Sequence, residues 1–161
     1  KNYIAPWQGG FGTTLSWKGF SLNAQFSWVA DRWMFNNDRF FEESNGLYTV
    51  YNQSRRLLYD RWKKPGDVTD IPRYGITPQM DSRFLEDASF LRLKNLTLGY
   101  AVPQNWLEKT HFFDSARIYV QGQNLLTFTK FSGIDPESSS NIYAAQYPMS
   151  RQFTLGIELS F

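Results

Sequence analysis

Two alternating runs joined by a two-residue turn decide the fold, and they read FGTTLSWKGFSLNAQFSWV over residues 11–29. In each run the apolar and aromatic side chains alternate with glycine or polar ones such as serine, threonine, asparagine and glutamine. Such alternation is typical of a strand with one apolar and one polar face. Lys18-Gly19 separates the runs, and glycine's access to positive φ favours a tight turn. The stretch therefore predicts an antiparallel β-hairpin.

Three further runs alternate in the same way, and the sequence predicts five strands, at about 11–17, 20–29, 89–102, 116–128 and 150–161. Most of them reach the roughly 9–11 residues that a tilted strand needs to cross a bilayer. The third run ends at Pro103, and its start is ambiguous. There Phe90 and Leu91 are both apolar, while Arg92 and Lys94 share the parity of Leu96.

The composition excludes several classes of protein. The 161 residues carry a formal net charge of only +2, which excludes a strongly basic nucleic-acid binder and an acidic disordered tail. No apolar run of about 18 residues occurs, which excludes a helical membrane protein. Aromatic residues make up 18% of the chain and are dispersed among polar ones. That mixture is typical of an outer-membrane β-barrel, and the alternative is a soluble β-rich domain that binds carbohydrate.

The connections between the predicted strands alternate in length. Lys18-Gly19 and residues 103–115 are the shorter ones, and residues of about 30–88 and 129–149 are the longer ones. Short periplasmic turns and long extracellular loops are the outer-membrane pattern, so we expect the two long connections to be extracellular. The spacing of apolar residues predicts one short helix, from about residue 47 to 63, in the first of them.

Five strands cannot close a membrane barrel, because an open edge would leave backbone groups unpaired in hydrocarbon and the smallest barrels have eight strands. We therefore expect the chain to supply the last strands of a larger barrel, with the others preceding Lys1. The final run supports this expectation, because its alternation, its glycine and its last phenylalanine look like the signal that the outer-membrane assembly machinery recognises. The alternative is an ordinary terminal strand. The residues of the predicted signal are Thr154, Gly156, Ile157, Leu159 and Phe161.

Three blocks of the sequence resemble the SusC/RagA family of TonB-dependent outer-membrane transporters. They are DASFLRLKNLTLGY at 87–100, followed by Pro103; QGQNLLTFTK at 121–130, continuing into GIDPE at 133–137; and residues 147–161. The resemblance implies an all-β fold, a transmembrane antiparallel barrel of 22 strands around an N-terminal plug domain. Residues 1–161 would be the C-terminal segment of that barrel and give its last five strands. The plug domain is not in this sequence.

The resemblance also implies a function. Members of the family import oligosaccharides or peptides across the outer membrane of Gram-negative bacteria, together with a SusD-like surface lipoprotein. The TonB complex would act through the absent N-terminal part. The other partners implied are the remaining barrel strands, the plug, membrane lipid and lipopolysaccharide, and no nucleic acid.

The sequence predicts no enzyme, no cofactor and no metal site. Cysteine is absent, and His111 is the only histidine, so zinc or triad chemistry lacks its usual residues. No phosphate-binding glycine motif occurs. Glu42-Glu43 suggests a carboxylate pair, but adjacent side chains on one element point in different directions, so we expect a solvated loop.

The candidates for ligand or lipoprotein contact are aromatic and arginine residues of the first long loop. Aromatic faces stack on sugar rings, and arginine donates to hydroxyls or carboxylates. The same residue types favour a protein interface, and they also suit a small core within the loop. The candidates are Trp33, Tyr48, Tyr51, Arg55, Arg56, Tyr59, Trp62, Arg73 and Tyr74.

Other aromatic residues fall near strand ends and are candidates for the girdle at the membrane interface. They are Trp7, Trp17, Trp28 and Tyr100, with Tyr119 as the weakest because its parity points inward. By parity, Arg92 and Lys94 lie on a lipid-facing side near its extracellular end, where lipopolysaccharide phosphates would meet them.

Overall fold

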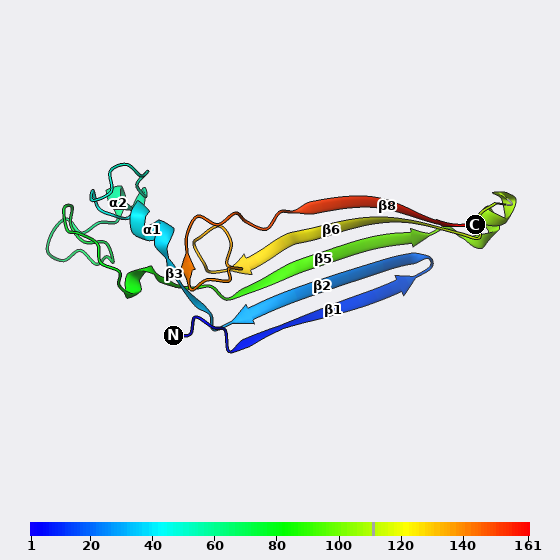
Figure 1. Ribbon diagram of the computed structural model, residues 1–161, viewed down its shortest axis with the longest axis horizontal. Helices are drawn as coiled ribbons and strands as arrows, with labels where there is room; N and C mark the ends of the chain where they lie inside the picture. Colours follow the sequence, from blue (N-terminus) through cyan, green and yellow to red (C-terminus); the bar gives the residue numbers. More distant parts are fainter. Residues whose placement is uncertain (111) are drawn as a thin grey trace. The chain divides into compact units, whose positions relative to one another are not determined.

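The alternating runs form one antiparallel sheet in a computed structural model of the chain. Its strands lie side by side in the order β1-β2-β5-β6-β8, and Figure 1 shows their alternating directions. The all-β prediction is confirmed, and the first strand begins four residues earlier than the sequence pattern indicated. The strands are β1 (Trp7–Trp17), β2 (Phe20–Ala30), β5 (Phe90–Ala101), β6 (Ser115–Thr129) and β8 (Gln152–Ser160).

The structure describes residues 1–110 and 112–161, which divide into two units. The sheet unit comprises Trp7–Ala30, Phe90–Thr129 and Met149–Phe161. The loop unit comprises Lys1–Pro6, Asp31–Ser89 and Lys130–Pro148. His111, the only histidine of the sequence, lies outside the described residues.

The hairpin between β1 and β2 is as tight as the sequence predicted. Trp17 pairs with Phe20 across a two-residue turn. Lys18 has φ +47° and Gly19 has φ +87°. Positive φ at both central residues defines the turn type whose twist matches that of the flanking strands.

Pairing across the sheet separates the side chains into apolar and polar rows that alternate along the strands. Residues paired directly across strands share a face, so each row belongs to one side of the sheet. One row contains only aliphatic residues, namely Leu15, Leu22, Leu98, Val120 and Leu155. The neighbouring row contains only polar residues, namely Thr14, Asn23, Thr97, Gln121 and Thr154.

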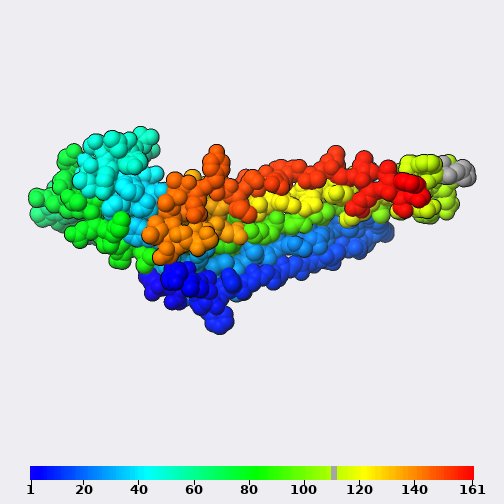
Figure 2. All heavy atoms as spheres, viewed as in Figure 1, coloured from blue at the N-terminus to red at the C-terminus, as the bar shows by residue number. Residues whose placement is uncertain are grey.

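Much of the apolar face of the sheet unit is exposed among the described residues. The side chains of Phe153 and Leu155 are 74% and 72% exposed, and the whole of β1 is exposed. A large exposed apolar face on a soluble monomer is unusual and marks contact with protein or membrane. Figure 2 shows the adjoining strands as parallel bands coloured from blue (β1) to red (β8).

Aromatic residues lie at both ends of this apolar face. Trp7 and Trp17 are at opposite ends of β1, and Phe20 stacks near Tyr100 with ring centroids 4.6 Å apart. Ten residue steps along β1 span about 33 Å. At a strand tilt of about 40° that length covers about 25 Å, the height of the apolar band in outer-membrane barrels.

The face of the sheet that the sequence predicted for Arg92 is corrected by a β-bulge. The register shifts between Leu93 and Asn95, so Leu93 pairs with Phe26 on the apolar face. Arg92 then pairs with Ser27 and falls on the opposite, polar face, where it is 2% exposed. Alternation counted along one strand missed this because a bulge inserts one residue and resets the parity. The proposed meeting of Arg92 with lipopolysaccharide on a lipid-facing side is therefore wrong.

The connection between β5 and β6 holds two short helical turns, α3 (Gln104–Leu107) and η2 (Glu108–Thr110). Pro103 precedes α3 and ends the strand pairing, as the sequence indicated. Among the described residues, none of the helices has the length and apolar character needed to span a membrane.

The loop unit contains a small sheet, two short helices and a 3-10 turn. In the sheet, β3 (Trp33–Asn36) lies between β4 (Leu85–Asp87) and β7 (Ile142–Tyr143). The helices are α1 (Asn37–Glu42) and α2 (Arg56–Tyr59), and the turn is η1 (Ser82–Phe84). The core is Met34, Ala88, Phe131 and Tyr143.

The single helix predicted over 47–63 is wrong. Only α2 lies in that range, and α1, which the sequence analysis missed, precedes it. The Gln53 amide donates to the carbonyls of Phe41, Tyr48 and Tyr51 at 3.1–3.3 Å. These side-chain bonds compete with helical ones. Tyr48 and Tyr51, which belong to the spacing that predicted the helix, both pack against Phe41.

Candidate functional site

Arg32 joins the first sequence block that carried the family resemblance to the segment that follows the second block. Its backbone carbonyl accepts from the N–H of Ala88 at 2.8 Å. Its guanidinium donates to the carbonyls of Ser138 and Ser140. In the second block, Asp135 accepts from the N–H of Glu137 at 2.9 Å and closes a turn. Residues 87–89 and 133–137 thus have a structural role in the loop unit.

A network of ion pairs holds the first long connection together. Arg39 contacts Glu43 at 3.1 Å, Glu86 at 3.2 Å and Asp70 at 3.0 Å. Arg56 contacts Glu43 at 2.7 Å and Asp70 at 2.8 Å. The two arginines therefore link α1, α2, β4 and the segment around residue 70. Because Glu43 is only 1% exposed, its paired arginines offset the cost of burying its charge.

The charges of this network shift several pKa values. Burial alone would raise the pKa of Asp70, but Arg56 and then Arg39 outweigh it and hold the pKa below its ordinary value. Burial, followed by repulsion from Asp38 and Glu43, raises the pKa of Glu42. Glu42 therefore lies among negative charges, whereas Asp70 lies between positive ones.

Two of the predicted contact residues, Tyr48 and Tyr51, form an aromatic cluster with α1. The Phe41 ring centroid lies 5.0 Å from that of Tyr48 and 5.3 Å from that of Tyr51. Phe40 packs edge-on against Phe41 and against Phe84, at 5.4 and 5.3 Å. Tyr48 is half-buried and Tyr51 is exposed. This cluster matches the alternative of a small core within the loop.

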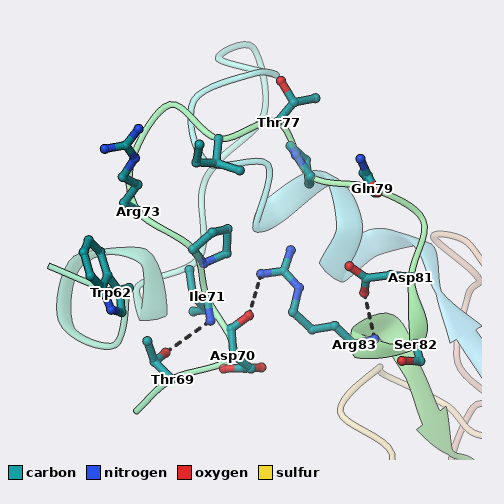
Figure 3. Close-up of a pocket in the computed structure, with 13 residues that line it drawn as sticks. Trp62, Thr69, Asp70, Ile71, Arg73, Thr77, Gln79, Asp81, Ser82 and Arg83 are labelled. Atoms are coloured by element: carbon teal, nitrogen blue, oxygen red, sulfur yellow. Dashed lines mark hydrogen bonds between the residues drawn. The ribbon is translucent and has the colours of Figure 1, made fainter. Parts of the chain in front are cut away.

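One cavity of the loop unit, of about 920 Å³, is an open groove along residues 69–83 that Trp62 also lines. Trp62 and Arg73 lie toward one end of the groove, and Gln79 and Asp81 toward the other (Figure 3). Arg83 crosses its floor and donates to the carbonyl of Asp70 at 3.2 Å. An aromatic ring beside side-chain donors and acceptors can hold either a sugar ring or an extended peptide.

The other predicted contact residues lie outside this groove. The Trp33 ring stacks under the Lys1 ammonium at 3.4 Å. The Arg55 guanidinium lies 5.1 Å from the Tyr59 ring, and Tyr59 is exposed. Tyr74 is exposed and borders a smaller cavity of about 180 Å³, and Arg56 belongs to the ion-pair network. The structure thus brings Trp62 and Arg73 to one groove and disperses the rest.

Sequence reasoning missed most of the residues that shape this region. Thr77, Gln79, Asp81 and Arg83 line the groove, but none of them was among the predicted contact residues. Glu42-Glu43 was expected to be solvated, yet only Glu42 is exposed while Glu43 is buried. One available signal was Asn36, whose side chain accepts from the N–H of Arg39 at 3.1 Å and begins α1.

The terminal strand shows why a glycine fits within the predicted assembly signal. Gly156 pairs directly with Tyr119, and a Cβ on Gly156 would overlap the Tyr119 ring. Phe161 stacks against Phe112 with ring centroids 6.1 Å apart. Gly156 is thus needed for packing within the sheet, independently of any recognition by the assembly machinery.

Comparison with known sequences yields TonB-dependent receptors. The chain is 34% identical over 165 residues to TonB-dependent receptor P3 of Formosa agariphila, covering 94% of the chain. It is 40% identical over 82 residues to TonB-dependent receptor SusC of Bacteroides thetaiotaomicron, covering 51% of the chain and 8% of SusC. The chain spans 16% of the length of receptor P3. No family model matches the sequence.

Comparison with solved structures gives the same result. The chain matches a RagAB peptide importer in its open-open state with a TM-score of 0.91 and 44% identity, over 100% of the chain and 18% of that structure's chain. A second structure of the RagAB peptide transporter matches with a TM-score of 0.88 and 45% identity, over 96% of the chain and 17% of its own.

Both comparisons place the chain among the β-barrel receptors of the TonB-dependent class. Within that class it belongs with the SusC and RagA group, as the three sequence blocks indicated. The relatives named are receptors, importers and transporters, not enzymes.

Proposed function

We propose that the chain is a wall segment and two extracellular loops of an outer-membrane nutrient importer. The observation that carries the proposal is the match of the whole chain to a RagAB importer at 44% identity. The exposed apolar face of the sheet unit, with aromatic residues at both ends, supports a lipid-facing wall. The polar rows on the other face would then line the lumen.

The cargo we propose is an oligosaccharide or a peptide, captured with the help of a SusD-like lipoprotein. The groove of Trp62, Arg73, Gln79 and Asp81 supplies a stacking surface and polar groups for such a ligand. The exposed rings of Tyr59 and Tyr74 are suited to a protein partner. Passage through the lumen would follow when the TonB complex acts on a plug domain.

The test uses the full-length protein in its native bacterium. Deleting its gene should abolish uptake of fluorescently labelled oligosaccharides or peptides, and restoring the gene should recover it. The purified protein should need detergent to stay monodisperse and should carry a lipoprotein with it. Unchanged uptake in the deletion strain, or a protein that is monodisperse without detergent, would contradict the proposal. The second result would favour the soluble carbohydrate-binding alternative.

A further inference from the structure

A second cavity of the loop unit lies beside α1 and is lined by carboxylates. Its volume is about 490 Å³, within the range of pockets that hold small organic groups. Asp38, Glu42 and Glu43 all line it. Ile134 and Tyr143 add apolar surface on the side contributed by the second long connection.

Negative charge exceeds positive charge around this cavity. Arg39 and Arg56 are its two cationic residues, and both are already engaged with Glu43 and Asp70. Glu86 and Asp60 add further carboxylates to the same two arginines. Asp38 and Glu42 contact neither arginine through any ion pair among the described residues. The cavity lining therefore holds three carboxylates and two guanidinium groups, and the guanidinium groups are shared with further carboxylates outside the lining.

A buried acceptor points to a donor from outside the chain. The Oε2 atom of Glu43 is enclosed and has no hydrogen-bond partner among the described residues, although Oε1 contacts both arginines. A buried carboxylate oxygen without a donor is costly, so such atoms are usually satisfied by a ligand or by water. Asp38 and Glu42 line the same cavity, and Glu42 is exposed while Asp38 is half-buried. Burial first, and then repulsion from Asp38 and Glu43, raises the pKa of Glu42.

We propose that this carboxylate-lined cavity binds an organic cation, an ammonium or guanidinium group carried by the imported ligand. The proposal rests on the proposed import function and specifies the chemistry of its cargo. Asp38 and Glu42 accept hydrogen bonds from the cationic group, and Glu43 supplies the innermost acceptor. The exposed side chain of Ile134 packs against the methylene groups that carry the charge.

Such a cation can come from a basic peptide or from an amino sugar, and matched probes separate these sources. The first pair is a capped pentapeptide with a central lysine and the same peptide with glutamine. The second pair is a tetramer of glucosamine and its fully acetylated form. Binding is measured by calorimetry to the full-length importer purified with its lipoprotein. We expect one cationic probe to bind about tenfold more tightly than its neutral partner, equivalent to about 1.4 kcal/mol.

Two substitutions test the assignment to this cavity. Asp38→Asn and Glu42→Gln keep the side-chain shape and remove the charge, and together they should abolish the preference. Asp67→Asn, a matched change at a carboxylate of the loop unit that lines neither this cavity nor the groove at residues 69–83, should leave the preference unchanged. Equal binding of both members in each pair would overturn the proposal, as would a preference that survives the double substitution.

The outcomes also separate this proposal from the import function. If the neutral probes are bound and imported to the same extent as the cationic ones, the proposed cation site is wrong but the proposed import function is supported. If none of the four probes binds, the cation site is wrong, and if their import also fails, the proposed import of oligosaccharides or peptides is contradicted. If Ca²⁺ competes for the cavity and the matched probes bind equally, the proposal is wrong and the cavity binds a metal ion instead of an organic cation.

Discussion

The sheet unit and the loop unit are stabilised in different ways. The sheet unit keeps large apolar side chains such as Phe153 and Leu155 exposed, and its order comes from strand pairing. The loop unit buries Met34 and Tyr143 completely and places charged Glu43 in its interior. The sheet therefore depends on what surrounds its two faces, whereas the loop unit depends on contacts among its own residues.

The largest effect is expected from a charge on the apolar face of the sheet. Leu155→Arg places a guanidinium in the all-aliphatic row, where burial at the middle of a bilayer costs about 2–4 kcal/mol. The full-length protein should then fail to assemble, as measured by its folded fraction in outer-membrane extracts. Thr154→Arg, one residue earlier on the polar face, is the matched control and should assemble normally. Equal assembly of both variants would show that the two faces of the sheet do not lie in different environments.

A smaller effect is expected from removing the cation at the centre of the loop unit. Arg39→Met leaves Glu43 and Glu86 with fewer partners in a buried setting, which costs about 3 kcal/mol by analogy with broken buried pairs. Limited proteolysis should cut residues 43–80 faster, while the sheet strands stay protected. Arg55→Met, a change next to the network that removes only a contact with Tyr59, is the control. A loss of sheet protection in Arg39→Met would show that the two units are not independent.

Substitutions at Gly156 can distinguish a role of this glycine in packing against Tyr119 from a role in recognition by the assembly machinery. Gly156→Ala forces a Cβ into the Tyr119 ring, and overpacking of this kind costs about 1–3 kcal/mol. Adding Tyr119→Ala removes the overlap, so the double variant should recover folded yield. If the glycine is instead required only by the assembly machinery, the second substitution will not rescue the first.

The smallest effect concerns pH. Because the pKa of Asp70 is held below its ordinary value of about 3.9, its ion pairs stabilise the loop unit above that pH. This contribution is lost as the pH falls through the folded-state pKa. Its size is below about 1 kcal/mol because the Asp70 side chain is 46% exposed. Glu42 titrates in the opposite sense, since its pKa is raised.

Asp70→Asn separates these two groups. The variant should lose the acid-dependent increase in proteolysis between about pH 5 and pH 3, whereas Glu42→Gln should retain it. An unchanged acid response in Asp70→Asn would mean that the pairs with Arg39 and Arg56 contribute nothing measurable.

How far the sequence predicts the structure differs between the two units for a physical reason. In the sheet, alternation is local, so the strands and the Lys18-Gly19 turn could be predicted from neighbouring residues. Alternation predicted the wrong face of the sheet for Arg92, because a bulge changes the parity and leaves no signal in the residue pattern. In the loop unit, Gln53, Arg39 and Arg32 bind residues far away in the sequence, and no period records such contacts. Trp62 and Arg73 were selected by residue type, but their shared groove with Gln79 and Asp81 needed the structure.

The most direct test of the central claim is the environment of each face of β8. The chain contains no cysteine, so single cysteines introduced at residues 153, 154, 155, 157 and 158 of a cysteine-free full-length protein can each carry a spin label. In native outer membranes, collision with oxygen should be high at 153, 155 and 157, and collision with a water-soluble nickel complex should be high at 154 and 158. That alternation between the two sets of positions is the predicted result for a lipid-facing barrel wall. High nickel accessibility at all five positions would contradict it and place both faces of the sheet in water.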